Sequence, residues 1–277
     1  MRGHRLAAIR SIPVLSVLLA VLLCAAMVGL GLVGARADTA PTAPFDAAIE
    51  HYRSQLVADV DRSVASVEKL RDSIASGDIA TARQAWIEAR VGWERAEVFT
   101  SGFAPELDRD IDAWPNGPTG FHAIEVTLFG AGHADVSSQV EALLRDLTEM
   151  AAKARQTRLT PQGLLDGLSR LAYEVGESKL DGGESRVSGT SLDDMRHNVE
   201  GIEQAYTTIF AAAVESRDPN LDGTVRRQID ELKSMLRPSD LRQIDQDRLR
   251  VASEDLVVML QTAAPEIALA RPTLELQ

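Results

Sequence analysis

Apolar residues along most of this chain recur at intervals of three and four positions. That spacing is the period of an α-helix, and the alternation typical of a half-buried strand is almost absent from about residue 45 onward. Glycine, proline and capping residues divide the pattern into predicted helices at about 45–75, 78–101, 119–130, 135–157, 161–179, 191–216, 222–236 and 239–263. The pattern predicts an all-α protein, an up-down helix bundle in which two four-helix bundles pack end to end.

Two polar segments between these helices are predicted to be irregular. Residues 102–119 contain three prolines and indicate an ordered loop. Residues 218–223, DPNLDG, resemble the opening of an EF-hand calcium loop, but Ile229 stands at the twelfth position, where a bidentate glutamate is required. We therefore interpret this segment as an interhelical turn.

The first 37 residues differ from the rest of the chain. Arg2, Arg5 and Arg10 precede a long apolar run, and the sequence ARA at 35–37 offers a small-x-small cleavage site. We interpret residues 1–37 as a signal peptide, with an N-terminal membrane anchor as the alternative because the run is long. Residues 38–45 are then a linker, and 46–277 are the helical domain. This organisation predicts export to the periplasm or cell envelope.

Cysteine and charge limit the chemistry of the exported part. Cys24 is the only cysteine and falls within the leader, where Leu23 replaces the small residue that a lipobox needs. A disulfide or thiolate metal site is therefore excluded from the remainder. The chain carries a net charge of −12, and the leader contains four arginines and no acid, so the remainder is more acidic still. This charge argues against nucleic acid as a partner, because phosphate binding needs a basic surface.

The segment GFHAIE, residues 120–125, places an imidazole and a carboxylate among apolar residues. On a helical wheel, Glu125 falls about 40° from Phe121 and so points into the apolar stripe, with His122 on its flank. A buried carboxylate is costly unless it is paired, hydrogen-bonded or bound to a metal. Glu125 therefore needs a partner, although a hydrogen-bonded structural histidine would explain His122 taken alone.

The segment WERAE, residues 93–97, repeats this arrangement on another predicted helix. Glu97 falls about 20° from Trp86 on the wheel, and Glu94 lies three residues before it on the flank. Inward carboxylates and imidazoles on facing helices are the means by which bundles build metal sites. The alternative for Glu94 is an exposed ion pair with Arg90 or Arg95.

Other acidic and histidine residues can be explained without a metal site. Asp108, Asp110 and Asp112 lie between the two candidate helices and are close enough in sequence to cover such a site, although Asp108 and Asp110 are better explained as loop caps and solvated charges. Trp86 and Trp93 are expected to pack in the core. Three histidines without matching neighbours are interpreted as surface residues: His51, His133 and His197.

These motifs resemble those of imelysin-like proteins, the family that includes the EfeO and EfeM components of bacterial iron uptake. GFHAIE resembles the family's GxHxxE signature, ARVGWERAE its segment ending in ExxE, LDRDIDA its LDxxIDA stretch, and HNVEG its NVEG. The resemblance covers most of 46–262 in the same order. It implies an exported protein with paired helical bundles and a metal site formed by Glu94, Glu97, Asp112, His122, Glu125 and Glu184.

This chain departs from the family pattern at three points. Gly189 stands where the family often has a histidine after the last glutamate, and Ala123 stands where a basic residue usually follows the signature histidine. The short segment 38–45 has no room for the cupredoxin domain that some relatives carry. These departures concern which metal binds and how tightly.

The candidate ligands are oxygens and one imidazole, a set that suits iron, manganese or calcium better than copper(I) or a thiolate-type zinc site. The leading hypothesis is a binding protein that captures a metal ion, expected to be iron, and delivers it to a membrane iron permease, with a peroxidase-like protein as a further partner. The second hypothesis is an enzyme, a metallopeptidase. The third hypothesis is a structural helical domain of the envelope. The sequence contains no HExxH motif to favour the peptidase.

Overall fold

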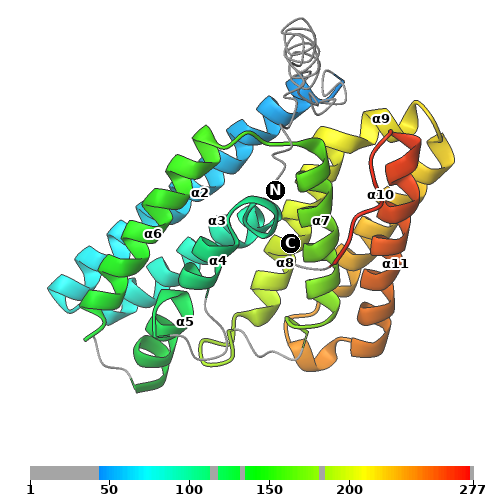
Figure 1. The fold of residues 1–277 in the computed structure, drawn as a ribbon. Coiled ribbons are helices and arrows are strands. Elements are labelled where there is room, and N and C mark those ends of the chain that lie inside the picture. Colours follow the sequence, from blue (N-terminus) through cyan, green and yellow to red (C-terminus); the bar gives the residue numbers. More distant parts are fainter. Residues whose placement is uncertain (1–43, 113–117, 132–134, 181–184, 275–277) are drawn as a thin grey trace, which may run out of the picture. The chain divides into compact units, whose positions relative to one another are not determined.

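The structure, a computed structural model, describes residues 44–112, 118–131, 135–180 and 185–274. These residues belong to one compact unit that begins at Thr42. Every regular element in the described residues is helical (Figure 1), which confirms the all-α prediction. The helices are α2 (Asp46–Ser76), α3 (Ile79–Phe103), α4 (Pro105–Ile111), α5 (Gly120–Glu125), α6 (Ser137–Gln156), α7 (Pro161–Gly176), α8 (Ser191–Ala205), α9 (Ala211–Glu215), α10 (Pro219–Met235) and α11 (Gln246–Glu266).

Capping residues explain why several predicted boundaries are accurate. Gly77 adopts a left-handed conformation with φ of 75° and ends α2, and the Asp78 side chain accepts a hydrogen bond from the Thr81 backbone N–H at 3.0 Å to begin α3. Thr160 caps α7 in the same way, with Pro161 in its first turn. Local chemistry is sufficient to define these ends.

Other boundaries differ from the predictions. The expected loop at 102–119 contains α4, because Pro105 begins a helix at the position where its missing N–H is not needed. The segment 218–223 is not a turn, since Asp218 caps α10 and the helix already begins at Pro219. α11 begins at Gln246, later than expected, after a 3₁₀ turn at Leu241–Gln243.

Two predicted helices contain π-helical turns. α5 continues into a π-helix at Val126–Ala131, and α8 continues through Tyr206–Phe210 into α9. π-turns are uncommon and often lie near functional sites. The first of them directly follows the signature segment GFHAIE.

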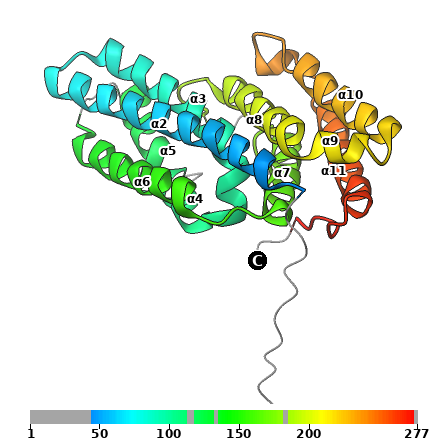
Figure 2. The same ribbon diagram turned by 90° about the horizontal axis from the view of Figure 1, so that it is seen from above.

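The central element of the domain is α3, which packs against α2, α7 and α8. α2 also packs against α6, while α7 packs against α11 and α11 against α10 (Figures 1 and 2). One half of the domain contains α2 and α6, and the other contains α7, α8, α10 and α11. Because α3 contacts α2 as well as α7 and α8, it is shared between the two halves. The end-to-end pairing of two separate four-helix bundles stays a prediction.

Aromatic packing fixes α5 against α3. Trp86 and Trp93 are both 0% exposed, as predicted for core residues. The ring of Phe121 meets that of Trp86 edge-on, with centroids 6.1 Å apart, and Trp86 Nε1 donates a hydrogen bond to the Phe121 carbonyl at 3.1 Å. The residue that follows Phe121 is His122, so this packing also sets the position of the imidazole.

The predicted leader lies outside the described residues, as does most of the linker. Phe45, which the sequence analysis assigned to the linker, is 5% exposed and packs against Phe210 at a centroid distance of 6.0 Å. The core therefore begins at least one residue earlier than expected. None of the helices in the described part of the chain combines the length and apolarity needed to cross a membrane.

Glycines allow neighbouring helices to approach α3 closely. A Cβ at Gly201 of α8 would lie 2.6 Å from the Arg95 carbonyl oxygen, and one at Gly167 of α7 would lie 2.1 Å from that of Val98. The backbone carbonyls of α3 cannot move without disturbing its own hydrogen bonds. Both contacts therefore require glycine on the approaching helix.

We expect Gly201→Ala to destabilise the protein by roughly 2 kcal/mol, because the added methyl group overpacks a backbone contact. The matched control is Gly223→Ala on α10, where the nearest atom is the terminal nitrogen of Arg227. That change should be neutral or stabilise the helix by up to about 1 kcal/mol. Urea denaturation measures both, and equal effects of the two substitutions would contradict the close-approach argument.

Candidate metal site

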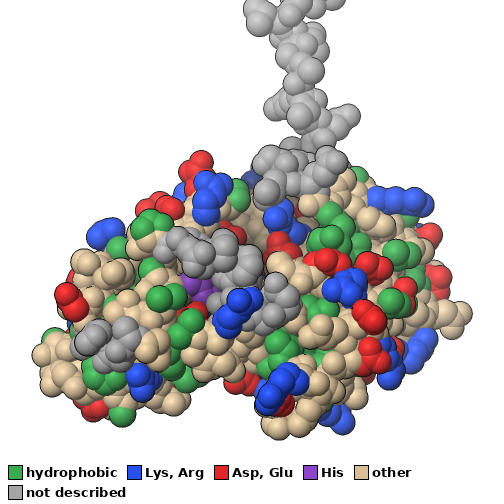
Figure 3. Space-filling model, turned by 90° about the horizontal axis from the view of Figure 1, so that it is seen from below, with side chains coloured by type: hydrophobic (Ala, Val, Ile, Leu, Met, Phe, Trp, Pro, Cys, Tyr) green, Lys and Arg blue, Asp and Glu red, His purple; other side chains and the backbone are tan. Residues whose placement is uncertain are grey.

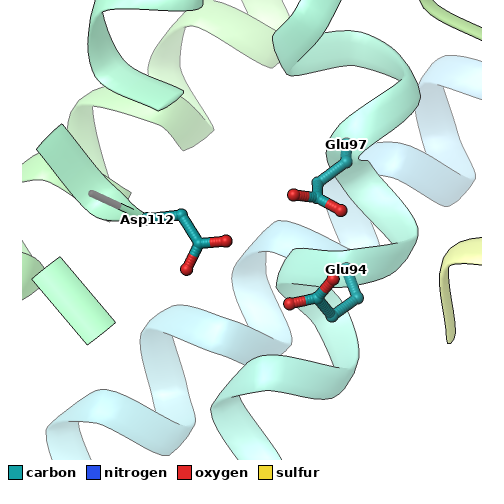
Figure 4. Close-up of side chains that lie close together, drawn as sticks. All are labelled: Glu94, Glu97 and Asp112. Atoms are coloured by element: carbon teal, nitrogen blue, oxygen red, sulfur yellow. The ribbon is translucent and has the colours of Figure 1, made fainter. Parts of the chain in front are cut away.

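Three carboxylates from two helices meet in the interior of the domain. Glu94 and Glu97 lie one turn apart on α3, and Asp112 is the residue that ends α4. One oxygen of each lies within 4.8 Å of the others, and Figure 4 shows Asp112 facing the two glutamates. This spacing allows a single cation to contact all three side chains, which we call the carboxylate triad.

The triad is almost completely removed from solvent. Glu94 is 0% exposed and Glu97 is 6% exposed. The side chain of Asp112 is 8% exposed. Ionised carboxylates at such depth are stable only with cationic or hydrogen-bonding partners, and the structure supplies several.

Arg90 is the first of these partners. It lies one turn before Glu94 on α3, and its guanidinium forms ion pairs with Glu94, Asp112 and, at 3.2 Å, with Asp194 of α8. The same group lies over the rings of Trp86 and Phe121, at 5.7 and 5.2 Å from their centroids. Arg90 is 1% exposed, so the aromatic contacts and the carboxylates together hold it in place.

Lys179 and Asn198 contact the two glutamates from other elements. The Lys179 ammonium, on the turn after α7, lies 3.2 Å from Glu94 Oε2 and 3.1 Å from Glu97 Oε2. Asn198 of α8 donates its amide N–H groups to Glu94 Oε2 at 2.8 Å, to the Glu94 carbonyl at 3.0 Å and to Glu97. The carboxylates are thus oriented by residues far apart in sequence.

His122 links the triad to Glu125. Its Nε2 lies 3.3 Å from Asp112 Oδ1, and its Nδ1 lies 3.0 Å from Glu125 Oε2. The other oxygen of Glu125 accepts hydrogen bonds from the backbone N–H and the hydroxyl of Ser188 at 2.8 and 2.7 Å. Glu125 therefore orients the imidazole and does not itself face the triad. Metal-binding histidines are commonly supported by a carboxylate in this way.

The electrostatic setting keeps Glu94 and Asp112 ionised. Burial opposes their charge, but Arg90 and Lys179 outweigh it and lower the pKa of Glu94, while Arg90 and His122 hold the pKa of Asp112 far below its usual range. At Asp194 burial prevails over Arg90 and raises the pKa to about 6. Burial likewise raises the pKa of Asp108, one turn before Asp112, to about 7. Glu94 and Asp112 therefore carry negative charge at neutral pH.

The sequence model of the Imelysin family matches residues 48–119 and 116–266. The chain belongs to the imelysin family. This confirms the resemblance that the GFHAIE and WERAE motifs suggested.

Relatives of this imelysin protein match it over about two thirds of the chain. An Efem/EfeO family lipoprotein of Staphylococcus haemolyticus is 28% identical over 204 residues, which cover 68% of this chain and 69% of the relative. The iron uptake system component EfeM of Pseudomonas syringae pv. syringae is 28% identical over 191 residues, covering 65% and 66% respectively. Relatives named as lipoproteins are exported, which confirms the expected extracytoplasmic location.

A solved structure shares the fold. A Parabacteroides distasonis protein, assigned there as an iron-regulated protein A precursor, superposes with a TM-score of 0.62 at 19% identity, covering 79% of this chain and 96% of that one. At this identity the likeness concerns the helical fold alone. It supports the all-α architecture of the imelysin domain.

The structure brings five of the six predicted ligands together. Glu94, Glu97 and Asp112 form the triad, His122 contacts Asp112, and Glu125 contacts His122. The sixth, Glu184, lies outside the described residues. The complete ligand set stays a prediction, with Glu125 now placed behind the histidine.

Some of the explanations that placed acidic and histidine residues at the surface are wrong. Glu94 is no exposed partner of Arg90, since both are buried. Asp108 is only partly exposed on α4, and its Oδ1 is a buried atom without a hydrogen-bond partner among the described residues, so it is not a solvated loop charge. His51 is exposed as predicted. His197 is only half-buried and does have a matching neighbour, because its Nδ1 lies 3.1 Å from Glu200 Oε2. His133 lies outside the described residues.

Sequence reasoning missed four residues that contact the triad or Arg90. They are Arg90, Lys179, Asp194 and Asn198, all nearly or completely buried. A signal existed for two of them: Arg90 lies one turn before Glu94, and Asn198 belongs to the NVEG motif used for the family resemblance. Lys179 and Asp194 occupy no recognisable motif, and only the tertiary structure places them at the site.

The pH dependence of stability tests the His122 contacts. Burial opposes the imidazolium, but Asp112 and the hydrogen bonds to Asp112 and Glu125 raise the pKa of His122 to about 9. Because the folded-state pKa is raised, this contribution to stability is complete below about pH 6.5 and is lost as the pH rises through 9. Relative to His122→Gln, the wild type should lose about 3 kcal/mol of unfolding free energy over that window.

Urea denaturation at intervals from pH 6 to pH 10 makes this measurement. His51→Gln, on the exposed side of α2, serves as the control and should show the wild-type pH profile. A difference between wild type and His122→Gln that stays constant across the range would contradict the proposed ion contacts.

Proposed function

We propose that this imelysin protein is the exported cation-binding component of an iron uptake system, which captures iron and delivers it to a membrane permease. The observation that carries the proposal is the buried carboxylate triad of Glu94, Glu97 and Asp112. Relatives named EfeM and EfeO, one of them described as an iron uptake system component, support the role in iron uptake.

The donor chemistry of the triad fits a hard cation. Its carboxylate oxygens match the ligands of ferrous, ferric or manganous ions and offer no sulfur for a soft one. Iron is the choice among these that agrees with the names of the relatives. It acts here as cargo and is transferred rather than retained.

The charge of the surrounding residues also favours cation uptake. Among the residues described, the buried cluster contains five carboxylates, those of Glu94, Glu97, Asp112, Glu125 and Asp194, against the cations Arg90, Lys179 and His122. The face in Figure 3 shows acidic and basic side chains interspersed. We therefore attribute cation attraction to the buried cluster more than to a single-sign surface field on that face.

In delivering this cargo, the protein would act together with a membrane iron permease and a peroxidase-like protein. These partners are inferred from the family relationship, and the acidic composition argues against nucleic acid. Release to a permease requires that binding be reversible. A cation bound beside Arg90 meets that requirement better than one in a purely anionic cage, because the positive charge of the guanidinium opposes it.

Calorimetric titration of the soluble domain with Fe²⁺ under anaerobic conditions tests the proposal. Glu97→Gln removes one ligand charge with little change of shape and should weaken binding by at least about tenfold. Glu88→Gln is the matched control, since Glu88 is on the same helix, is 42% exposed and pairs with Lys69. Equal affinities of wild type and Glu97→Gln for Fe²⁺ would refute the site.

The peptidase that the family name suggests makes a separate prediction. A metal-bound water beside a carboxylate could hydrolyse a peptide bond, whereas a capture protein should leave casein intact with or without added metal. We expect no cleavage by the Fe²⁺- or Zn²⁺-loaded protein. Cleavage that disappears both with chelator and in His122→Ala would favour the enzyme instead.

A further inference from the structure

We propose that the Lys179 ammonium occupies the place that the cargo cation takes between Glu94 and Glu97, so that metal uptake is an exchange against this built-in cation. The inference rests on the proposed function and concerns what sets the affinity of the site. Lys179 then acts as an internal competitor that keeps the cation-free protein stable and makes the bound cation releasable.

The position of the ammonium carries the argument. Lys179 Nζ lies 3.2 Å from Glu94 Oε2, 3.3 Å from Glu97 Oε1 and 3.1 Å from Glu97 Oε2. It thus contacts the same two carboxylates that form one side of the triad. A metal ion bound to these oxygens would need to lie about 2.0–2.6 Å from each. Two cations cannot share that space, because they would lie nearly in contact at low dielectric.

Lys179 is suited to leave, whereas Arg90 is not. Lys179 extends from the turn after α7, and its flexible four-carbon chain can withdraw the ammonium while the carboxylates on α3 stay in place. Arg90 is on α3 itself, lies over two aromatic rings and contacts carboxylates from three elements. The two buried cations therefore have different roles: Arg90 is a fixed part of the site, and Lys179 is its exchangeable occupant.

The exchange also gives the site a selectivity. An entering cation must interact with the triad more strongly than the ammonium does, and it must also lose its own hydration. A monovalent ion offers no more charge than Lys179, so it gains nothing by replacing it. Divalent and trivalent ions gain at least one further unit of charge against the same carboxylates.

Removing the competitor should have opposite effects on the two states of the protein. In Lys179→Gln the glutamates lose a buried cation, so the cation-free protein should melt at a lower temperature. The same variant should bind Fe²⁺ and Mn²⁺ at least about tenfold more tightly than wild type, because no ammonium has to be displaced. A lysine with only a structural role would lower stability and affinity together, so the opposite signs separate the two explanations.

Anaerobic calorimetry with Fe²⁺ and with Mn²⁺, together with thermal melting in the presence and absence of each metal, makes the test. Lys153→Gln is the matched control: Lys153 on α6 is 45% exposed, and its ammonium lies 4.0 Å from Glu149 Oε1. This change removes the same charge from the surface and should alter the affinity by less than twofold. Lys179→Arg retains the cation and should not gain affinity.

The outcomes separate this inference from the proposed function. Metal binding by wild type with unchanged or weaker binding by Lys179→Gln would overturn the competitor role and leave the proposed function intact. Binding by neither protein would overturn both. If Lys179→Gln is unfolded without metal, refolding on Mn²⁺ addition, followed by circular dichroism, would support the exchange, and the absence of refolding would overturn it.

Discussion

The ion pairs of Arg90 with Glu94, Asp112 and Asp194 are the interaction on which the rest of the site depends. Arg90 draws together carboxylates from α3, from the end of α4 and from α8. Without a cation at that point the interior would contain several uncompensated negative charges, and loss of one partner of such a network costs about 3–5 kcal/mol. The aromatic rings of Trp86 and Phe121 fix where the guanidinium can lie. The same packing thus determines both the geometry of the carboxylates and the stability of the domain.

The placement of α3 turns this local network into a domain-wide one. α3 carries Arg90, Glu94 and Glu97 and packs against α2, α7 and α8. The glycines of α7 and α8 let the backbones approach closely, which brings Asp194 and Asn198 of α8 and the turn bearing Lys179 within reach of the glutamates. A shift of α8 or of the α7 turn would therefore change the electrostatics of the site directly. The binding of a cation and the packing of these helices are coupled through the same residues.

The sequence was sufficient for the fold class and for the inward positions, because helical period and capping are local properties. The wheel correctly placed Glu97 and Glu125 in the apolar interior. It failed on Glu94, which lies on the flank of the apolar stripe yet is buried, because α8 and the Lys179 turn cover that flank. It also missed α4, since three prolines in 102–119 suggested a loop although Pro105 begins a helix. Lys179 and Asp194 could not be predicted, because their contacts to the site are about 85 to 104 residues distant in sequence.

Tertiary contacts determine what Glu125 of the HxxE motif does. A buried carboxylate needs compensation, and the sequence left open whether a metal or the protein supplies it. Ser188 supplies it through its backbone N–H and hydroxyl, and Gly189, with φ of 78°, follows it in the left-handed conformation that glycine favours. The turn that lacks the family's histidine thus provides two donors to Glu125 instead. With both oxygens of Glu125 committed, to Ser188 and to His122, Glu125 determines how the imidazole beside Asp112 is held.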